Sequence, residues 1–473
     1  MKQLPNILII MADQQRYDCI GSSGMRPVQT PHLDRLASEG TRFTHAFSHI
    51  PLCGPARQSF MNGRRAETFG GLWNEGIALP VGSLSPNEYV WPRELKAQGY
   101  VSHYLGKWGV SAAHDPTAYG YDAYTSEGDY ARFRKGRFPE VEYRAGYFGE
   151  PDPVPLASSR THWFADRAAE AIRGWAQAGQ SWHMRLNFTE PHLPNRPAGR
   201  FATMYDPADI EPWAGFADTF ANKPYIQRQM QASWGVEHYG WDDWAQVVAR
   251  YYGVVSQADE AIGRVLAALE ETGEAGETIV VYSADHGDMC GSHGMMDKHC
   301  VMYDDIVRVP LIVRWPGRVS AGAVSDAFVY NLLDVPPTLL DWLGCAAPET
   351  LHGRSLRPLL EANASGAGGQ PASDGEWRDA VVASYNGQQF GLYTQRMIRT
   401  REWKYVWNTA DVDELYRLDV DPGELTNAIG DPAHAEIVRE LRRRLYDVLR
   451  QDGDALVGNE WMRRQLLEGK IVS

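Results

Sequence analysis

Cys53 lies in a segment whose residue types could support covalent catalysis. Pro55 and Arg57 follow it in the order Cys-x-Pro-x-Arg, and the run Ser-Phe-Met-Asn-Gly-Arg comes next at 59–64. A single cysteine is more often a small buried hydrophobe than a nucleophile, so its neighbours decide its role. If the segment opens a helix, Arg57 lies about one turn after residue 53, where its guanidinium could hold an anion. The positive end of the helix dipole would favour the same anion.

Two polar pairs close two apolar runs and could bind a metal ion. Asp13 and Gln14 follow the run at 6–11, and Asp285 and His286 follow the run at 278–284. Such pairs often cap turns, but carboxylate, amide and imidazole groups are also metal ligands. We expect one divalent metal ion at these pairs. Hard oxygen ligands favour calcium and also suit magnesium, and the imidazole makes manganese an alternative.

Four further side chains could contact an anionic ester. Lys107 lies in Gly-Lys-Trp-Gly, Lys298 in Met-Asp-Lys-His, His192 in Pro-His-Leu-Pro and Asn74 in Leu-Trp-Asn. A lysine is usually a solvated surface charge, and a histidine between prolines often caps a turn. In a preorganised site, however, the lysines would stabilise the charge of a tetrahedral transition state. An imidazole that titrates near neutrality suits a general acid or a donor to a bridging oxygen.

Together these motifs resemble those of the type I sulfatases, a family of the alkaline phosphatase superfamily. The resemblance runs from residue 6 to the segment Glu-Leu-Tyr-Arg-Leu-Asp-Val-Asp-Pro-Gly-Glu at 414–424. It implies that a formylglycine-generating enzyme oxidises Cys53 to formylglycine and that position 53 joins the metal ligands. The hydrated aldehyde has two hydroxyls: one attacks sulfur, and the other lets the intermediate expel sulfate. The metal is needed because such a hydroxyl is nearly unionised at neutral pH.

The resemblance also implies roles for the cationic residues. Lys107 corresponds to the lysine that bridges formylglycine and sulfate, and Lys298 corresponds to the sulfate-binding lysine. Arg57 holds the nucleophile, and His192 corresponds to the histidine that faces the leaving-group oxygen. We therefore expect a sulfatase that hydrolyses the sulfate monoester of an aryl, alkyl or sugar alcohol.

Several positions depart from the common sulfatase pattern. Gln14 and His286 replace an aspartate and an asparagine, although choline-sulfatase-like and phosphonate monoester hydrolase-like members also have Asp-His. Asn74 resembles an active-site asparagine of the phosphonate monoester hydrolases. Gly109 stands where many sulfatases have a histidine associated with deprotonating the second hydroxyl. Two histidines could substitute for it, His103 and His114.

Two alternatives to the sulfatase interpretation therefore stay open. The first is a phosphonate monoester or phosphodiester hydrolase of the same superfamily, which typically has a tyrosine in place of Lys107. The second belongs to another class: a ligand-binding protein that retains the fold but is never modified at Cys53.

The order of apolar runs predicts an α/β fold. Branched apolar residues at 6–11, 183–188, 278–283 and 310–313 indicate buried strands, and 30–40, 160–177 and 244–272 have helical periodicity. Strands that alternate with long helices favour a large, mainly parallel sheet sandwiched by helices. The resemblance implies the alkaline phosphatase-like version of this fold.

A second, smaller unit is predicted at the C-terminus. Residues 361–375 are rich in Ala, Ser, Gly, Asn and Pro and indicate a linker or a long surface loop. Residues 396–407 and 413–419 then read as antiparallel strands with a turn at Arg401 and Glu402, and 433–451 as a helix. We therefore divide the chain into a catalytic domain at 1–375 and an α+β subdomain at 376–473.

Composition limits the partners and the compartment. A formal net charge of -14 disfavours a nucleic-acid or anionic-membrane partner, and no apolar stretch is long enough for a membrane span. The N-terminal residues lack a small-residue cleavage site, and the five cysteines are scattered. We expect a cytoplasmic protein rather than a periplasmic or secreted one, and a homo-oligomer is consistent with enzymes of this kind.

Overall fold

The main sheet contains the apolar runs predicted as strands. A computed structural model describes residues 4–470 apart from 77–80, 362–376 and 388–390. The strands of this sheet are β1 (Asn6–Asp13), β2 (Thr41–Phe47), β3 (Val101–Gly106), β4 (Ala123–Ser126), β5 (Trp182–Pro191), β6 (Thr278–Ala284), β7 (Arg308–Arg314), β8 (Ala323–Ser325) and β9 (Val329–Tyr330). Their order is β4-β3-β5-β1-β6-β7-β2-β8, with β9 also paired to β2.

The sheet is mixed but mainly parallel, as predicted. β1 pairs in parallel with β5 and β6, whereas β7 is antiparallel to β6 and β2. Every residue of β1 and β6 is buried, which explains why both read as continuous apolar runs. Their carboxyl ends therefore lie side by side, and the polar residues that follow them are brought together.

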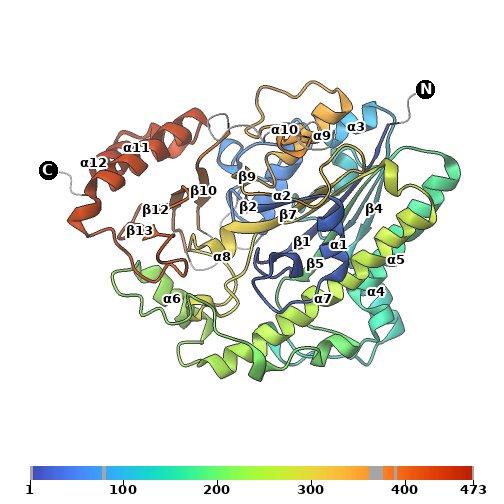
Figure 1. The fold of residues 1–473 in the computed structure, drawn as a ribbon, viewed down its shortest axis with the longest axis horizontal. Helices are drawn as coiled ribbons and strands as arrows, with labels where there is room; N and C mark the ends of the chain where they lie inside the picture. The colour runs from blue at the N-terminus through green and yellow to red at the C-terminus, as the bar shows by residue number, and fades with distance from the viewer. Residues whose placement is uncertain (1–3, 77–80, 362–376, 388–390, 471–473) are drawn as a thin grey trace.

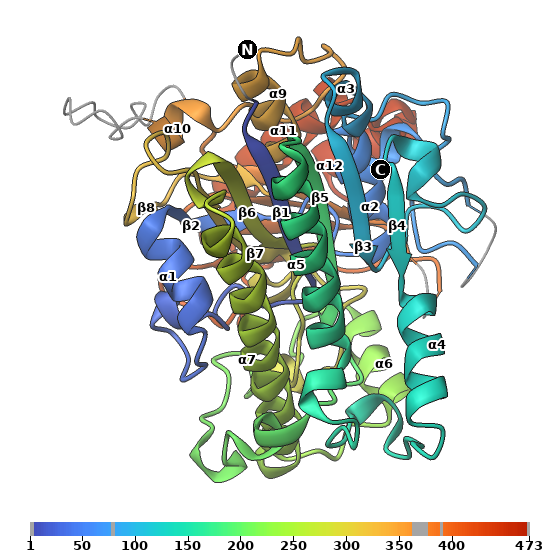
Figure 2. The same ribbon diagram turned by 90° about the vertical axis from the view of Figure 1, so that its right-hand side faces the viewer.

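Helices cover both faces of this sheet. The helices of this part of the chain are α1 (Pro31–Glu39), α2 (Cys53–Asn62), α3 (Pro92–Ala97), α4 (Glu127–Arg137), α5 (Arg160–Ala178), α6 (Tyr225–Trp234), α7 (Trp241–Glu271), α8 (Asp304–Val307), α9 (Val335–Leu343) and α10 (Arg357–Glu361). Figure 2 shows α5 and α7 side by side over one face, with α2 behind the sheet. All ten residues of α2 are buried, so the helix that begins at Cys53 is fixed along its whole length. Among the described residues, none of the helices combines the length and apolar character needed to cross a bilayer.

A separate antiparallel sheet forms near the C-terminus (Figure 1). Its strands, in spatial order, are β10 (Val381–Tyr385), β11 (Gln395–Arg399), β12 (Trp403–Asn408) and β13 (Glu414–Arg417). β11 and β12 form the predicted hairpin, and α11 (Ala435–Gln451) and α12 (Glu460–Glu468) follow. Apolar residues of the sheet, such as Ile398 and Trp407, share a buried cluster with Leu441 and Leu445 of α11. The linker predicted at 361–375 lies, except for Glu361, outside the described residues, so the domain boundary stays a prediction.

Buried charges join the two sheets. The Lys404 Nζ of β12 lies 2.8 Å from Asp304 Oδ1 of α8 and 2.7 Å from Glu424 Oε1, and the Arg399 Nη2 lies 3.1 Å from Asp304 Oδ2. Burial favours neutral carboxyls, yet Arg399 and Lys404 hold the pKa of Asp304 well below its ordinary value. Burial raises the pKa of Glu424 to about 7 although Lys404 opposes it. Each ion therefore depends on the others for its stabilisation.

Replacing Lys404 should test this junction. Lys404→Met leaves two buried carboxyls without their shared cation, so we expect the free energy of unfolding to fall by about 3–5 kcal/mol. Urea unfolding followed by circular dichroism measures the change. Lys96→Met is the control, because Lys96 pairs with Asp122 at the surface, where such pairs contribute about 0–1 kcal/mol. Equal stability of the two variants would contradict the assigned role of Lys404.

Candidate active site

The candidate catalytic residues meet at the carboxyl edge of the main sheet. Asp13 is the last residue of β1, Asp285 follows β6 directly, and Cys53 is the first residue of α2. All three are buried. The sheet register therefore places two carboxylates beside the amino end of a helix, where that helix favours negative charge.

Arg57 connects these three elements. Its Nη2 donates to Asp13 Oδ2 at 2.9 Å, its Nε donates to Asp285 Oδ2 at 3.0 Å, and its Nη1 donates to the backbone oxygen of Lys107 at 2.9 Å. The side chains of Arg57, Asp13 and Asp285 are all fully buried. The guanidinium, placed one helical turn after Cys53 as predicted, thus donates to both carboxylates and to the Lys107 backbone oxygen. The expected contact of Arg57 with the nucleophile stays a prediction.

Four buried residues supply a donor set that fits a metal ion. Ligand atoms of Asp13, Cys53, Asp285 and His286 all lie within 4.8 Å of one another. His286 Nδ1 lies 2.9 Å from the Gly287 oxygen and can only donate there, so in the neutral ring Nε2 carries the lone pair that a metal ion would need. That Nε2 lies 3.1 Å from Cys53 Sγ. Burial opposes protonation of this ring, yet Asp285 and Cys53 raise the pKa of His286 to about 9. Oriented oxygen and nitrogen donors of this kind suit a divalent cation.

Gln14, which the sequence predicts as a metal ligand, lies next to this donor set. Its backbone has a φ of 68°, and its N–H donates to Asp285 Oδ1 at 3.1 Å. The amide Nε2 donates to Asp288 Oδ2 at 2.7 Å, and Lys298 Nζ donates to Oε1 at 2.8 Å. Both ends of the amide are therefore oriented, with the oxygen on the side of Lys298.

Electrostatics favours negative charge at the centre of the cluster. Burial and Asp13 would raise the pKa of the Cys53 thiol, but Lys107, Lys298 and His286 outweigh them and leave it well below its ordinary value. Burial likewise opposes ionisation of Asp13, yet Lys107, His192 and Arg57 hold its pKa well below the usual range. An anion generated at position 53 would therefore be stabilised.

The two lysines approach from different sides. Lys107 Nζ, the more exposed of the two, lies 2.6 Å from Asp13 Oδ2. Lys298 Nζ is buried and lies 2.9 Å from His192 Nε2 and 3.1 Å from Asp297 Oδ1. His192 Nδ1 lies 2.6 Å from the Leu193 oxygen, which must accept, so the Nε2 of the neutral ring accepts from Lys298. The structure brings both lysines and the histidine to one centre.

Asn74 contacts the start of the nucleophile helix. Its Oδ1 accepts from the Gly54 N–H at 2.7 Å. A Cβ at residue 54 would lie 2.7 Å from that oxygen, so the close approach requires glycine. Asn74 thus positions the backbone next to Cys53 in addition to any contact with substrate.

Gly109 cannot supply the missing base, and the suggested substitutes lie elsewhere. His103 Nε2 lies 2.8 Å from Thr125 Oγ1, and its ring stacks edge-on against Trp175 of α5. His114 is exposed, and its backbone oxygen accepts from Trp108 Nε1. His286, rather than either of these, is the imidazole beside Cys53.

The sequence interpretation missed residues that hold Lys107. The backbone oxygen of Lys107 accepts from Asn187 Nδ2 at 3.1 Å and from the Tyr104 hydroxyl at 2.8 Å, in addition to Arg57. Gly106 has a φ of 91°, and a Cβ there would lie 1.9 Å from the backbone oxygen of Asn187, so only glycine fits at this position. The available signal was an asparagine inside the buried run at 182–188.

Three features stand together at this site: a mixed α/β sheet, a buried donor set at its carboxyl edge that could hold a metal ion, and a cysteine that begins the adjacent helix. The sulfatase family model matches residues 5–345, and the model of the N-sulphoglucosamine sulphohydrolase C-terminal region matches residues 291–451. The chain therefore belongs to the sulfatase family of the alkaline phosphatase superfamily and is a sulfuric ester hydrolase. The family membership predicted from the motifs is confirmed.

Named relatives extend over nearly the whole chain. An arylsulfatase of Clostridium perfringens is 28% identical, covering 95% of each chain. An N-acetylglucosamine-6-O-sulfatase of Bacteroides thetaiotaomicron is 26% identical, covering 95% of this chain and 87% of that relative. The phosphonate monoester hydrolase of Agrobacterium radiobacter has a solved structure with a TM-score of 0.79 and 25% identity, covering 95% of this chain and 96% of that one. The fold is thus shared by sulfatases and phosphonate monoester hydrolases.

Asn187 should affect catalysis through the position of Lys107. Asn187→Leu removes one of three donors to the Lys107 oxygen, so we expect kcat/KM for an aryl sulfate to fall about tenfold. The control is Asn408→Leu, which changes an equally buried asparagine in the second sheet. It should lower the melting temperature but leave kcat/KM of the folded enzyme unchanged. If both variants lose activity only in proportion to the fraction of unfolded protein, Asn187 does not position Lys107 for catalysis.

Proposed function

We propose that the protein hydrolyses sulfate monoesters through a formylglycine formed from Cys53, with one divalent metal ion at the strand ends. The observation that carries this proposal is the buried set of Asp13, Cys53, Asp285 and His286, joined by Arg57. The family generally uses a metal ion and formylglycine. Oxidation by a formylglycine-generating enzyme would supply a geminal diol, one hydroxyl of which attacks sulfur while the other lets sulfate leave.

The metal ion would be held by Asp13, Gln14, Asp285, His286 and position 53. When bound, it supplies positive charge that lowers the pKa of the attacking hydroxyl. Arg57 keeps the two carboxylates in register through its two donated hydrogen bonds. Calcium is the proposed ion, because most of the donors are hard oxygens.

Lys107 and Lys298 would bind the ester oxygens of the sulfate. Both lie against the anionic centre, and burial of Lys298 excludes the water that would screen its charge. The positive charges neutralise the oxygens as the bond to the leaving group lengthens. Asn74 contributes by fixing the Gly54 backbone beside the nucleophile.

His192 would protonate the alcohol that leaves. Its Nδ1 proton is committed to the Leu193 oxygen, so the proton for the leaving oxygen would come from Nε2, which accepts from Lys298 while the ring is neutral. With substrate bound, Lys298 would donate to the ester instead. Lys298, 2.9 Å from Nε2, lies between this histidine and Gln14. Lys298 would therefore bind the ester next to the imidazole that protonates the leaving alcohol.

A sulfated saccharide is the proposed substrate class, with aryl sulfates as surrogate substrates. A relative in Bacteroides thetaiotaomicron is named for N-acetylglucosamine 6-O-sulfate, and one structural neighbour was solved with its substrate D-glucosamine-2-N,6-O-disulfate. We further propose a cytoplasmic location and a homo-oligomeric state. Cell fractionation and light scattering test these two proposals.

Phosphonate monoester or phosphodiester hydrolysis is the second candidate function. Gln14 and His286 lie at the metal-binding edge, and Asn74 contacts the nucleophile helix, as expected if these residues belong to that branch. The multifunctional alkaline phosphatase superfamily protein of Trinickia caryophylli, 28% identical over 93% of this chain and 94% of that relative, gives this candidate further support. Lys107 in place of tyrosine favours sulfate as the main substrate.

Substrate preference can be measured directly. We expect kcat/KM to be higher for 4-nitrophenyl sulfate than for a 4-nitrophenyl phosphonate monoester. Lys107→Tyr should shift the ratio towards the phosphonate, because it removes a positive charge that neutralises sulfate oxygens. Arg132→Tyr, a change on the exposed face of α4, serves as the control. A wild-type enzyme that prefers the phosphonate would overturn the sulfatase assignment in favour of the second candidate.

Metal removal tests the ligand set. Dialysis against a chelator should abolish hydrolysis, and calcium should restore more activity than manganese or magnesium. His286→Asn exchanges an imidazole for an amide oxygen. In this variant the activity restored by manganese should therefore fall relative to the activity restored by calcium. Elemental analysis gives the bound ion. Full turnover in a metal-free sample would contradict the proposed role of the strand-end residues.

A further inference from the structure

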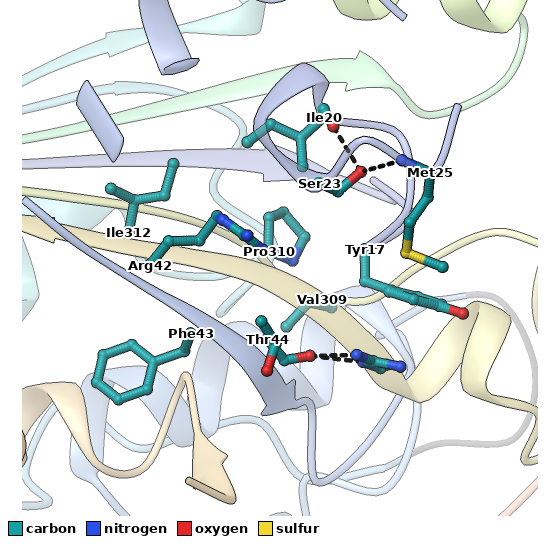
Figure 3. A pocket seen from close by; sticks show the side chains of 11 residues that line it. Tyr17, Ile20, Ser23, Met25, Arg42, Phe43, Thr44, Val309, Pro310 and Ile312 are labelled. Carbon is teal, nitrogen blue, oxygen red and sulfur yellow. Dashed lines mark hydrogen bonds between the residues drawn. The ribbon is translucent and has the colours of Figure 1, made fainter. Parts of the chain in front are cut away.

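A small cavity lies against β2 and β7 beneath the segment that follows β1. Its volume is about 110 Å³, and its walls include Arg42, Thr44, Arg308 and Tyr17 (Figure 3). Ile20 and Ile312 form part of the apolar lining of this cavity. None of the metal-binding or cationic residues of the catalytic centre lines it, so this cavity is distinct from that centre.

Two arginines of neighbouring strands face this cavity. Arg308 Nε donates to the Thr44 backbone oxygen at 2.7 Å, and its guanidinium stacks over the Tyr17 ring at 4.1 Å. Arg42 comes from β2, next to β7 in the sheet, and its side chain reaches into the same space (Figure 3). Within the described part of the chain, Arg42 has no hydrogen bond or ion pair from its side chain.

Both cationic and acidic groups lie near these arginines. Burial and then Arg308 lower the pKa of Arg42, and Asp34 acts in the opposite direction. Burial lowers the pKa of the adjacent His45 to about 3, with Arg308 and Arg399 acting in the same direction. The nearby carboxylate, Asp304, lies 3.8 Å from Arg308 Nη1 and is already shared with Arg399 and Lys404. The cavity thus places two guanidinium groups along its wall in a chain whose formal net charge is -14.

We propose that this cavity binds a small tetrahedral oxyanion, with inorganic sulfate, the product of the proposed reaction, as its ligand. Guanidinium groups match sulfate oxygens in charge and geometry. The cavity is well below the roughly 300 Å³ at which drug-sized ligands are usually enclosed, so it admits an oxyanion rather than a sugar ring. Phosphate shares this chemistry and is the competing source of the ligand.

Sulfate in this cavity would connect the two strands to the segment at 17–25. That segment begins shortly after Asp13 and Gln14, so the bound ion would stabilise the part of the chain that follows two metal ligands. The protein would thereby respond to accumulated product at a place other than its catalytic centre.

Isothermal titration with sodium sulfate tests the proposal. The wild-type protein should bind two sulfates per chain, one at the catalytic centre and one at Arg42. Arg42→Gln should lose the second site, with affinity weakened about tenfold or more, because a charged donor is removed. Arg318→Gln, which changes an exposed arginine outside the cavity, should retain both sites. Arg42→Lys keeps the charge and should bind sulfate with intermediate affinity.

Diffraction from crystals soaked in selenate locates the second site independently of variant folding. An anomalous peak between the guanidinium groups of Arg42 and Arg308 is the expected result. A single sulfate per chain, two sites that both survive Arg42→Gln, or binding of phosphate without sulfate at this cavity would each overturn the proposal. Because sulfate bound at Lys107 and Lys298 is counted separately, failure here is distinguishable from failure of the sulfatase function.

Discussion

The site depends on one constraint: Arg57 donates one hydrogen bond to Asp13 and another to Asp285. The guanidinium is fully buried, and its charge is balanced by carboxylates from the ends of two neighbouring strands. Those carboxylates would repel each other at this separation without the cation. Because Arg57 is one turn into α2, the same contact fixes where the helix begins and hence where Cys53 lies. The same contacts therefore fix the ends of the two strands, the start of α2 and the positions of the candidate metal ligands.

Charged and polar residues around this contact also balance one another. Lys107 and Lys298 add positive charge around Asp13 and around Cys53, whose thiol pKa is well below its ordinary value. Gln14 accepts a hydrogen bond from Lys298 and donates one to Asp288. Buried ions of this kind are costly unless each has partners, which accounts for the dense hydrogen bonding of the site. A second buried set, Asp304, Lys404 and Glu424, joins the catalytic sheet to the C-terminal one. The protein therefore uses paired charges both to build its catalytic edge and to join its two sheets.

Much of this arrangement could be predicted from sequence, because apolar runs and polar strand ends have readable patterns. The runs ending at Asp13 and Asp285 are buried on both faces, and the terminal hairpin has its turn where the sequence placed it. The contacts that orient the site could not be predicted. Asn187 and Tyr104 reach the Lys107 oxygen only because β3 and β5 are adjacent, and Asn74 meets Gly54 through a loop with no periodicity. Such contacts depend on tertiary packing, which local patterns do not encode.

The most direct measurement of the central claim is the mass of the proteolytic peptide that contains position 53, compared with turnover. The protein is produced with and without a formylglycine-generating enzyme, and aryl sulfate hydrolysis is measured on the same samples. The account predicts a peptide lighter by the change from a thiol to an aldehyde, with kcat proportional to the fraction converted. Full hydrolytic activity in a preparation that contains only the unmodified Cys53 thiol would contradict it.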